Sequence, residues 1–264
     1  FPTHSARASE YTQMVKSITQ SMRFMETVMS THFRESYGVD IFTSHEALLL
    51  GYEEAQTRTV PRRSGFYNLT THLPWVGYRT NNVDGAHVEY FRGLENPVGV
   101  KVGPQTSSDQ LLDLAKLLNP QNEPGKLVFI HRFGAAEIAK KLPPLIDVAR
   151  RANLRATWCC DPMHGNTFVT EGGIKTRQFE SVFNEMVSAF EIHTEGGSFL
   201  GGAHLEVTGD NVTECLGGTV RVEEIDLKRA YKSAVDPRLN YDQAMELAFL
   251  ISEKMAQANR QKRP

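Results

Sequence analysis

The segment Trp158-Cys159-Cys160-Asp161-Pro162-Met163-His164-Gly165-Asn166-Thr167 begins as a short apolar run and ends in a turn rich in Pro, Gly and Asn. This pattern predicts a buried strand that delivers polar side chains at its carboxyl end. In α/β barrels, that end of the strand carries the chemistry. A lone histidine after a strand is more often a turn residue with satisfied hydrogen bonds. The crowding of Asp161, Pro162 and Gly165-Asn166 around His164 favours a functional role instead.

Apolar runs on both sides of this segment alternate with amphipathic stretches, which is typical of βα units. About six strands are expected, whereas a closed barrel of this class has about eight and an open sheet of about six is also common. Periodicity does not decide between them, and no glycine-rich dinucleotide fingerprint follows any strand. Strands are expected at Tyr67–Pro74, Pro97–Val102, Lys126–His131, Arg155–Cys160 and Ala203–Val207, with a weaker one near Ser233–Asp236, and helices at Ser107–Leu118, at Ala135–Ala152 with a break at Pro143-Pro144, at Lys175–His193 and at Tyr241–Gln257.

The amino-terminal part of the sequence has a helical pattern. Ser9–Met29 carries methionine, isoleucine and valine at helical spacing, which predicts an amphipathic helix that faces a core. Ser44 is suited to cap a second helix that opens at Ser44–Ala47 and runs through Tyr52 toward Arg58. No repeat or low-complexity linker divides the sequence. We therefore expect one domain over residues 1–264, with amino-terminal helices in residues 1–60 and βα units in residues 66–264.

Composition excludes several classes of protein. The 264 residues are 40% hydrophobic and 23% charged, with a formal net charge of −2, which suits one large domain with a core. This balance does not favour nucleic-acid binding. No apolar run approaches the roughly 20 residues that a membrane helix needs, and no signal peptide is visible. The three cysteines, two of them adjacent, argue against a disulfide framework and indicate a reducing, cytoplasmic setting.

Three cations lie at the ends of the expected strands or within them. Arg79 follows the first strand, Lys101 lies in the second, and Arg132 follows the third. Each one alone is more often a surface group, and Lys101 could extend its charge to solvent. If the strands are parallel, however, the three cations converge at one edge. Such a cluster would bind a phosphate and a carboxylate.

His164, Glu206 and Asp236 are expected at the ends of three further strands. One imidazole and two carboxylates form a mixed set of nitrogen and oxygen ligands, suited to Mn²⁺, Co²⁺ or Fe²⁺ at an open catalytic position. Their wide separation in the sequence gives no metal-binding signature, so simple ion pairing is the alternative. His204 is a competing ligand, because alternation places it on the same face as Glu206.

Several long motifs resemble the type II 3-deoxy-D-arabino-heptulosonate 7-phosphate (DAHP) synthases. They are WVGYRT (75–80), NPVGVKVGP (96–104), WCCDPMHGNT (158–167), HLEVTGDNVTECLGG (204–218) and VDPRLNYDQAMELAF (235–249). The resemblance implies a TIM (β/α)8-type barrel. It implies that Arg79, Lys101 and Arg132 bind phosphoenolpyruvate, with His164 beside them in the catalytic site. It also implies that His164, Glu206 and Asp236 hold a divalent metal, Mn²⁺ or Co²⁺.

Two departures from the family pattern qualify this expectation. The family's first two barrel strands, which carry a fourth, cysteine metal ligand, are expected upstream of this sequence, which starts at Phe1-Pro2 rather than at Met. Cys160 and Cys215 match other family cysteines, so they do not replace that ligand. Tyr78 stands where the family motif usually has an acidic residue before the arginine.

The expected function is a metal-dependent, aldol-like condensation of phosphoenolpyruvate with an aldose phosphate, erythrose 4-phosphate by default. This reaction opens the shikimate pathway or a specialised version of it. Two alternatives stay open: a shortened regulatory homologue that binds phosphoenolpyruvate, and a related lyase with another aldehyde. An incomplete barrel would expose strand edges, so we expect a homo-oligomer, a partner that supplies strands, or cover from the Ser9–Met29 helix. The isolated chain is expected to bind metal more weakly than a complete family member and to turn over slowly or not at all.

Overall fold

The computed structural model describes residues 9, 12–13, 15–17, 19–20 and 40–261. Contacts divide the chain into a unit of residues 1–42 and a unit of residues 43–264. In the first unit the described residues between 9 and 20 are helical, and the rest of the helix predicted at Ser9–Met29 lies outside the described residues. Among the helices that the structure describes, none is long and apolar enough to cross a membrane.

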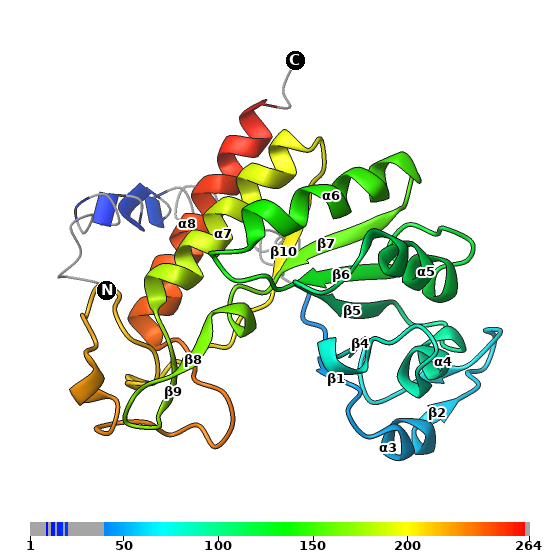
Figure 1. Ribbon diagram of the computed structural model, residues 1–264, viewed down its shortest axis with the longest axis horizontal. Coiled ribbons are helices and arrows are strands. Elements are labelled where there is room, and N and C mark those ends of the chain that lie inside the picture. Colours follow the sequence, from blue (N-terminus) through cyan, green and yellow to red (C-terminus); the bar gives the residue numbers. More distant parts are fainter. Residues whose placement is uncertain (1–8, 10–11, 14, 18, 21–39, 262–264) are drawn as a thin grey trace. The chain divides into compact units, whose positions relative to one another are not determined.

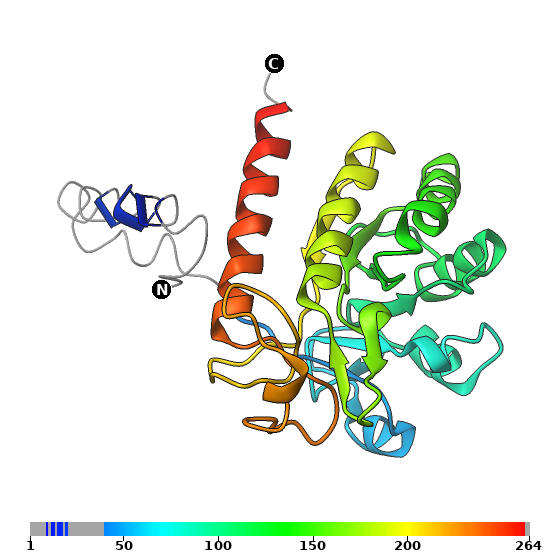
Figure 2. The ribbon, with the colours of Figure 1, turned by 60° about the vertical axis from the view of Figure 1, so that its left-hand side comes forward.

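The second unit is built on a six-stranded, all-parallel sheet with the order β1-β4-β5-β6-β7-β10. Parallel neighbours need long crossover connections, and α5 and α6 supply two of them beside β5, β6 and β7 (Figure 1). Figure 2 shows α7 and α8 side by side. The fold is therefore α/β, with strands and helices alternating as in part of a TIM-type barrel.

The bounds of the sheet strands and of the main helices follow. The strands are β1 (Ser44–Glu46), β4 (Leu73–Val76), β5 (Val98–Val102), β6 (Leu127–His131), β7 (Ala156–Cys160) and β10 (Leu200–Ala203), and the helices are α3 (Leu50–Ala55), α4 (Ala86–Arg92), α5 (Ser108–Leu118), α6 (Ile138–Arg151), α7 (Phe179–Glu195) and α8 (Tyr241–Gln261). Two antiparallel pairs, β2 (Thr57–Arg58) with β3 (Tyr67–Asn68) and β8 (Thr167–Val169) with β9 (Lys175–Arg177), lie outside the sheet.

The central strands and α5 confirm the sequence pattern. β5, β6 and β7 fall inside their predicted ranges. Ser107 caps α5 by accepting a hydrogen bond from the backbone N–H of Gln110 at 3.1 Å. The helix buries leucine and alanine side chains at helical spacing against the sheet. Local pattern and tertiary packing agree here, which is why these boundaries were predictable.

The helix predicted to open at Ser44 is wrong. Ser44–Glu46 forms β1, which pairs in parallel with β4, and the Ser44 hydroxyl donates to the carbonyl of Leu73 instead of capping a helix. The helix in this region, α3, begins only at Leu50. Pairing with a distant strand therefore outweighs the local capping signal.

Three other predicted boundaries are also wrong. The strand expected at Tyr67–Pro74 splits into β3 and β4, and β10 ends at Ala203, where the predicted strand began. Ser233–Asp236 is not a strand, because the carboxylate of Glu214 accepts the backbone N–H groups of Lys232 and Ser233 that a sheet neighbour would otherwise bind. Val207 and Leu239 form only an isolated parallel bridge.

The predicted helix boundaries at Lys175 and at the two prolines need correction as well. Lys175–Arg177 is β9, and α7 starts at Phe179. Helix α6 is unbroken through Pro143-Pro144. Pro143 and Pro144 are the sixth and seventh residues of α6, so the bonds that their amides would make to the carbonyls of Ala139 and Lys140 are absent, yet the helix continues to Arg151.

The two faces of β5 set up the site. Val98, Val100 and Val102 belong to the hydrophobic core, and alternation sends Gly99 and Lys101 to the opposite face. A Cβ atom on Gly99 would lie 2.9 Å from the Cβ of Trp75, so only glycine leaves room for that indole. The Trp75 ring in turn lies under the Lys101 ammonium, 5.8 Å from the ring centroid to Nζ.

Candidate functional site

A cavity of about 730 Å³ lies at the carboxyl ends of the sheet strands. Its wall brings together residues from β1 to the loop before α8, almost 200 positions apart in the sequence. All six site residues predicted from the sequence line this one cavity: Arg79, Lys101, Arg132, His164, Glu206 and Asp236. The remaining lining residues are Ser44, Glu46, Trp75, Gly77, Tyr78, Thr167, Lys175, His204 and Leu205.

The three cations differ in how strongly they are already paired. Lys101 is 4% exposed and forms an ion pair with Asp161. Arg132 donates to the backbone carbonyl of His164 at 2.6 Å, and its guanidinium carbon lies 5.0 Å from the Tyr78 ring centroid. The buried Nε of Arg132 has no hydrogen-bond partner within the described part of the chain. Arg79 is exposed. The cavity therefore offers cationic donors to an anion.

His164, Glu206 and Asp236 form a compact group. The Nε2 of His164 lies 3.3 Å from a Glu206 oxygen and 3.7 Å from an Asp236 oxygen. One ligand atom from each residue lies within 4.8 Å of the other two. His164 comes from the turn after β7, Glu206 from the segment after β10, and Asp236 from the loop before α8. A divalent cation between them would find one nitrogen and two oxygen donors.

Asp161 orients His164 for this role. Its Oδ2 lies 2.7 Å from the Nδ1 of His164, and its Oδ1 accepts the backbone N–H groups of Met163 and His164. The carboxylate thus holds the ring by Nδ1 and leaves Nε2 facing Glu206 and Asp236. A carboxylate behind a histidine is the usual outer support of a metal ligand. The donor set fits a divalent metal on this geometry.

Burial and charge set the protonation of this group without metal. Burial lowers the pKa of His164, but its bonds to Asp161 and Glu206 raise that pKa more, to about 9. Burial raises the pKa of Asp161, yet His164 and Lys101 hold it well below its ordinary range. In the same way, the pKa of Glu206 is lowered by His164 and Arg177 against the effect of burial. A cation must therefore displace a proton from His164.

His204, the competing ligand, lines the cavity but is not part of the group. Its ring packs edge-on against Trp75 at 5.0 Å and lies 6.2 Å from the His164 ring. Burial, together with the charge of Lys101, lowers the pKa of His204 to about 4. A neutral imidazole beside Lys101 is the result.

Sequence reasoning missed Lys175 and Arg177. Both come from β9, which was predicted as part of a helix. Lys175 pairs with Asp236, and the fully buried Arg177 lies 2.5 Å from a Glu206 oxygen and donates to the hydroxyl of Thr167 at 2.9 Å. The alternation of Lys175, Thr176 and Arg177 after a Gly-Gly turn was the available signal for a strand.

Comparisons with known proteins agree with this architecture. A model of the class-II DAHP synthetase family matches residues 1–252. A Neurospora crassa protein named phospho-2-dehydro-3-deoxyheptonate aldolase is 45% identical over 97% of this chain and 57% of its own length. A Streptomyces coelicolor protein of the same name is 42% identical over 96% of this chain and 56% of its own length. The chain thus spans a little over half the length of these relatives. It belongs to the class-II DAHP synthetase family.

Proposed function

We propose that this chain carries the phosphoenolpyruvate and metal sites of a DAHP synthase, which joins phosphoenolpyruvate to erythrose 4-phosphate and releases phosphate. The convergence of three cations and a His–Glu–Asp group in one cavity supports this proposal most directly. The names of the relatives agree with the same reaction class.

Phosphoenolpyruvate would be held by Arg79, Lys101 and Arg132. Its phosphate and carboxylate are the anions that guanidinium forks bind in a bidentate manner. Arg132 is preorganised for this, because the Tyr78 ring and the His164 carbonyl fix its guanidinium while Nε keeps an unused donor. Lys101 would share its charge between the ligand and Asp161.

His164, Glu206 and Asp236 would hold the divalent metal, with Mn²⁺ or Co²⁺ as the proposed ion. As a Lewis acid, that ion would polarise the aldehyde oxygen of the second substrate. The cations hold the enol carbon of phosphoenolpyruvate next to the aldehyde, and this positioning is the entropic share of catalysis. The methylene carbon of phosphoenolpyruvate would form the new carbon–carbon bond, water would add to the neighbouring carbon that bears the phosphate, and phosphate would then leave.

The first test is phosphoenolpyruvate binding by calorimetry with Mn²⁺ present. Arg132→Ala should lower the affinity roughly tenfold or more, because a charge-assisted bond is lost, and metal content should stay the same. Arg92→Ala is the matched control, since Arg92 is exposed on α4 and pairs only with Glu89 among the described residues. Arg79→Lys should also weaken binding, because an ammonium cannot form the fork.

Equal affinity in wild type and Arg132→Ala would remove Arg132 from the site. Failure of the wild-type chain to bind phosphoenolpyruvate with Mn²⁺ would refute the proposal. Phosphate release should then be measured with phosphoenolpyruvate and erythrose 4-phosphate together. Binding without release would favour the regulatory alternative instead.

A further inference from the structure

A second cluster of polar side chains lies between the sheet and α7, away from the cavity described above. His131 ends β6, Cys160 ends β7 as its register partner, and Glu185 comes from α7. All three are fully buried, and one ligand atom from each lies within 4.8 Å of the other two. A polar cluster with no exposure needs internal partners.

His131 does not have such partners within the described part of the chain. Neither Nδ1 nor Nε2 of this fully buried ring forms a hydrogen bond there. Its neighbours are rings: Phe133 at 5.8 Å, Trp158 at 6.4 Å and His193 at 5.5 Å between centroids. The Nε2 of His193 is also buried without a partner among those residues. Two imidazoles with unused nitrogens beside a thiol and a carboxyl indicate an additional ligand.

We propose that His131, Cys160 and Glu185 form a second metal site, structural in role, for a borderline-soft divalent cation of the Zn²⁺ class. Imidazole, thiolate and carboxylate are the ligands that Zn²⁺ takes in proteins. Tetrahedral bonds of 2.0–2.3 Å place ligand atoms roughly 3.3–3.8 Å apart. The ligand atoms of His131, Cys160 and Glu185 would therefore have to shift by only about an ångström to coordinate the ion together.

Charge balance supports this assignment. A divalent cation, one thiolate, one carboxylate and one neutral imidazole sum to zero, which a fully buried site requires. Without a cation, burial raises the pKa of Cys160 well above its ordinary value and that of Glu185 to about 7. The cation would replace both of these protons. The His193 ring lies 5.5 Å from the His131 ring between centroids, so His193 is a candidate for a fourth ligand.

The outer support for such a site is already built. Glu185 Oε1 accepts the backbone N–H groups of Phe133 and Gly134 at 2.9 and 3.0 Å, and Oε2 accepts from Asn166 at 2.7 Å. These bonds fix the carboxylate, as expected for a ligand. They also tie down the loops that carry Arg132 and His164. A metal here would therefore stiffen the floor of the open cavity.

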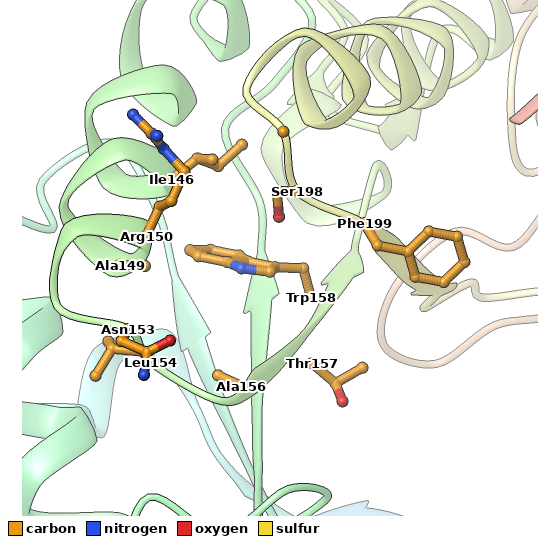
Figure 3. Close-up of a pocket in the computed structure, with 11 residues that line it drawn as sticks. Ile146, Ala149, Arg150, Asn153, Leu154, Ala156, Thr157, Trp158, Ser198 and Phe199 are labelled. Atoms are coloured by element: carbon orange, nitrogen blue, oxygen red, sulfur yellow. The ribbon is translucent and has the colours of Figure 1, made fainter. Parts of the chain in front are cut away.

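A second cavity, of about 320 Å³, is lined by Trp158 and Ser198 and by none of the three cluster residues. Figure 3 shows the indole of Trp158 reaching from β7 toward Ala149 of α6, with Ser198 nearby. The same indole packs 5.5 Å from the His193 ring, and the Ser198 hydroxyl lies 3.1 Å from Nδ1 of His193. Trp158 and Ser198 therefore connect this cavity to His193, which lies beside the cluster.

The test uses the double variant Cys159→Ser/Cys215→Ser, which leaves Cys160 as the only cysteine of the chain. The chain is unfolded, stripped with a chelator and refolded with Co²⁺, a spectroscopic probe for a Zn²⁺ site. We expect a near-ultraviolet thiolate-to-Co²⁺ charge-transfer band that saturates at one equivalent. We also expect one tightly bound Zn²⁺ per chain after refolding with Zn²⁺ and desalting.

Two further variants locate the ion. Adding His131→Leu to the double variant should abolish the band, whereas adding Glu206→Gln should leave it unchanged, because Glu206 lines only the open cavity. No band in the unmodified chain or in the double variant would overturn the proposal, whether or not the His131 variant folds. A band that survives His131→Leu would overturn the ligand set. The readout is independent of phosphoenolpyruvate binding, so it stands apart from the proposed function.

Discussion

Cys159 and Cys160 are adjacent in β7 but lie on opposite faces of the sheet, and the polar groups on these two faces differ in how their protonation is controlled. The open group, His164 with Glu206 and Asp236, lines a cavity and is held by ion pairs to Asp161, Lys175 and Arg177. The buried group, His131 with Cys160 and Glu185, has no exposure. Charges in the open group raise the pKa of its histidine to about 9, whereas burial lowers the pKa of His131. Neighbouring charge decides protonation in one region, and desolvation decides it in the other.

We expect the largest loss of stability from a substitution of Asp161, which pairs with both Lys101 and His164. In Asp161→Asn, an amide would face the Lys101 ammonium and Nδ1 of His164, so a buried cation would lose its counter-charge. We expect the free energy of unfolding to fall by about 3–5 kcal/mol, measured by urea denaturation. Asp147→Asn is the control, because Asp147 pairs with Arg150 and Arg151 on the surface of α6. Equal losses in the two variants would show that Asp161 is not the anchor.

The next effect is a pH dependence that differs between the regions. In the metal-free chain, protonated His164 should stabilise the fold fully below pH 6.5, its unfolded pKa, and lose that contribution as the pH rises to about 9. This contribution of His164 to the free energy of unfolding is up to about 3 kcal/mol. His193, with a pKa lowered to about 4, acts in the opposite direction. As the pH falls below 6.5, His193 takes up a proton in the unfolded chain but not yet in the folded one. The free energy of unfolding therefore decreases on the acid side.

The measurement is the free energy of urea unfolding of chelator-treated protein from pH 7 to pH 9. The wild type should lose stability across this range relative to His164→Gln, which lacks the titrating group. Parallel curves for the two proteins would contradict the ion-pair origin of the shift. His193→Gln serves as the control, because its effect should be confined to acid pH.

The smallest effect compares adjacent cysteines. Cys160→Ser would place a hydroxyl without a ready partner in a fully buried position, at a cost of about 1–3 kcal/mol. Cys159 is only partly buried and lies near Lys101, so Cys159→Ser should lower the free energy of unfolding by less than about 1 kcal/mol. Thermal unfolding of metal-free protein measures both. A larger loss for Cys159→Ser would contradict the assignment of Cys160 to the fully buried face of β7.

Both thiols should also react slowly with alkylating reagents at pH 7, because burial raises their pKa values, to about 12 for Cys159. Thiol reactivity therefore does not distinguish Cys159 from Cys160, whereas the stability of their serine variants and the Co²⁺ spectra do.

Much of the site was predictable because the signal was local. Apolar runs fix β5, β6 and β7, and parallel strands share one carboxyl edge. That is why the sequence alone predicts that Lys101, Arg132 and His164 lie close together. Glu206 and Asp236 also reach the cavity, although neither lies at the end of a strand as predicted. Their position depends on irregular segments held by Glu214, Arg177 and the isolated Val207–Leu239 bridge.

By itself, the sequence determined the βα alternation, the central strands, the Ser107 cap and the family motifs, because each depends on neighbouring residues. Tertiary structure alone decided that Ser44–Glu46 is an edge strand and that Lys175–Arg177 is a strand rather than a helix start. It also decided that Asp161 holds both Lys101 and His164, and that His131, Cys160 and Glu185 meet behind the sheet. The physical reason is that these features depend on partners far away in the sequence, as Lys101 is from Asp161, or on register between strands, and local propensity carries no information about either.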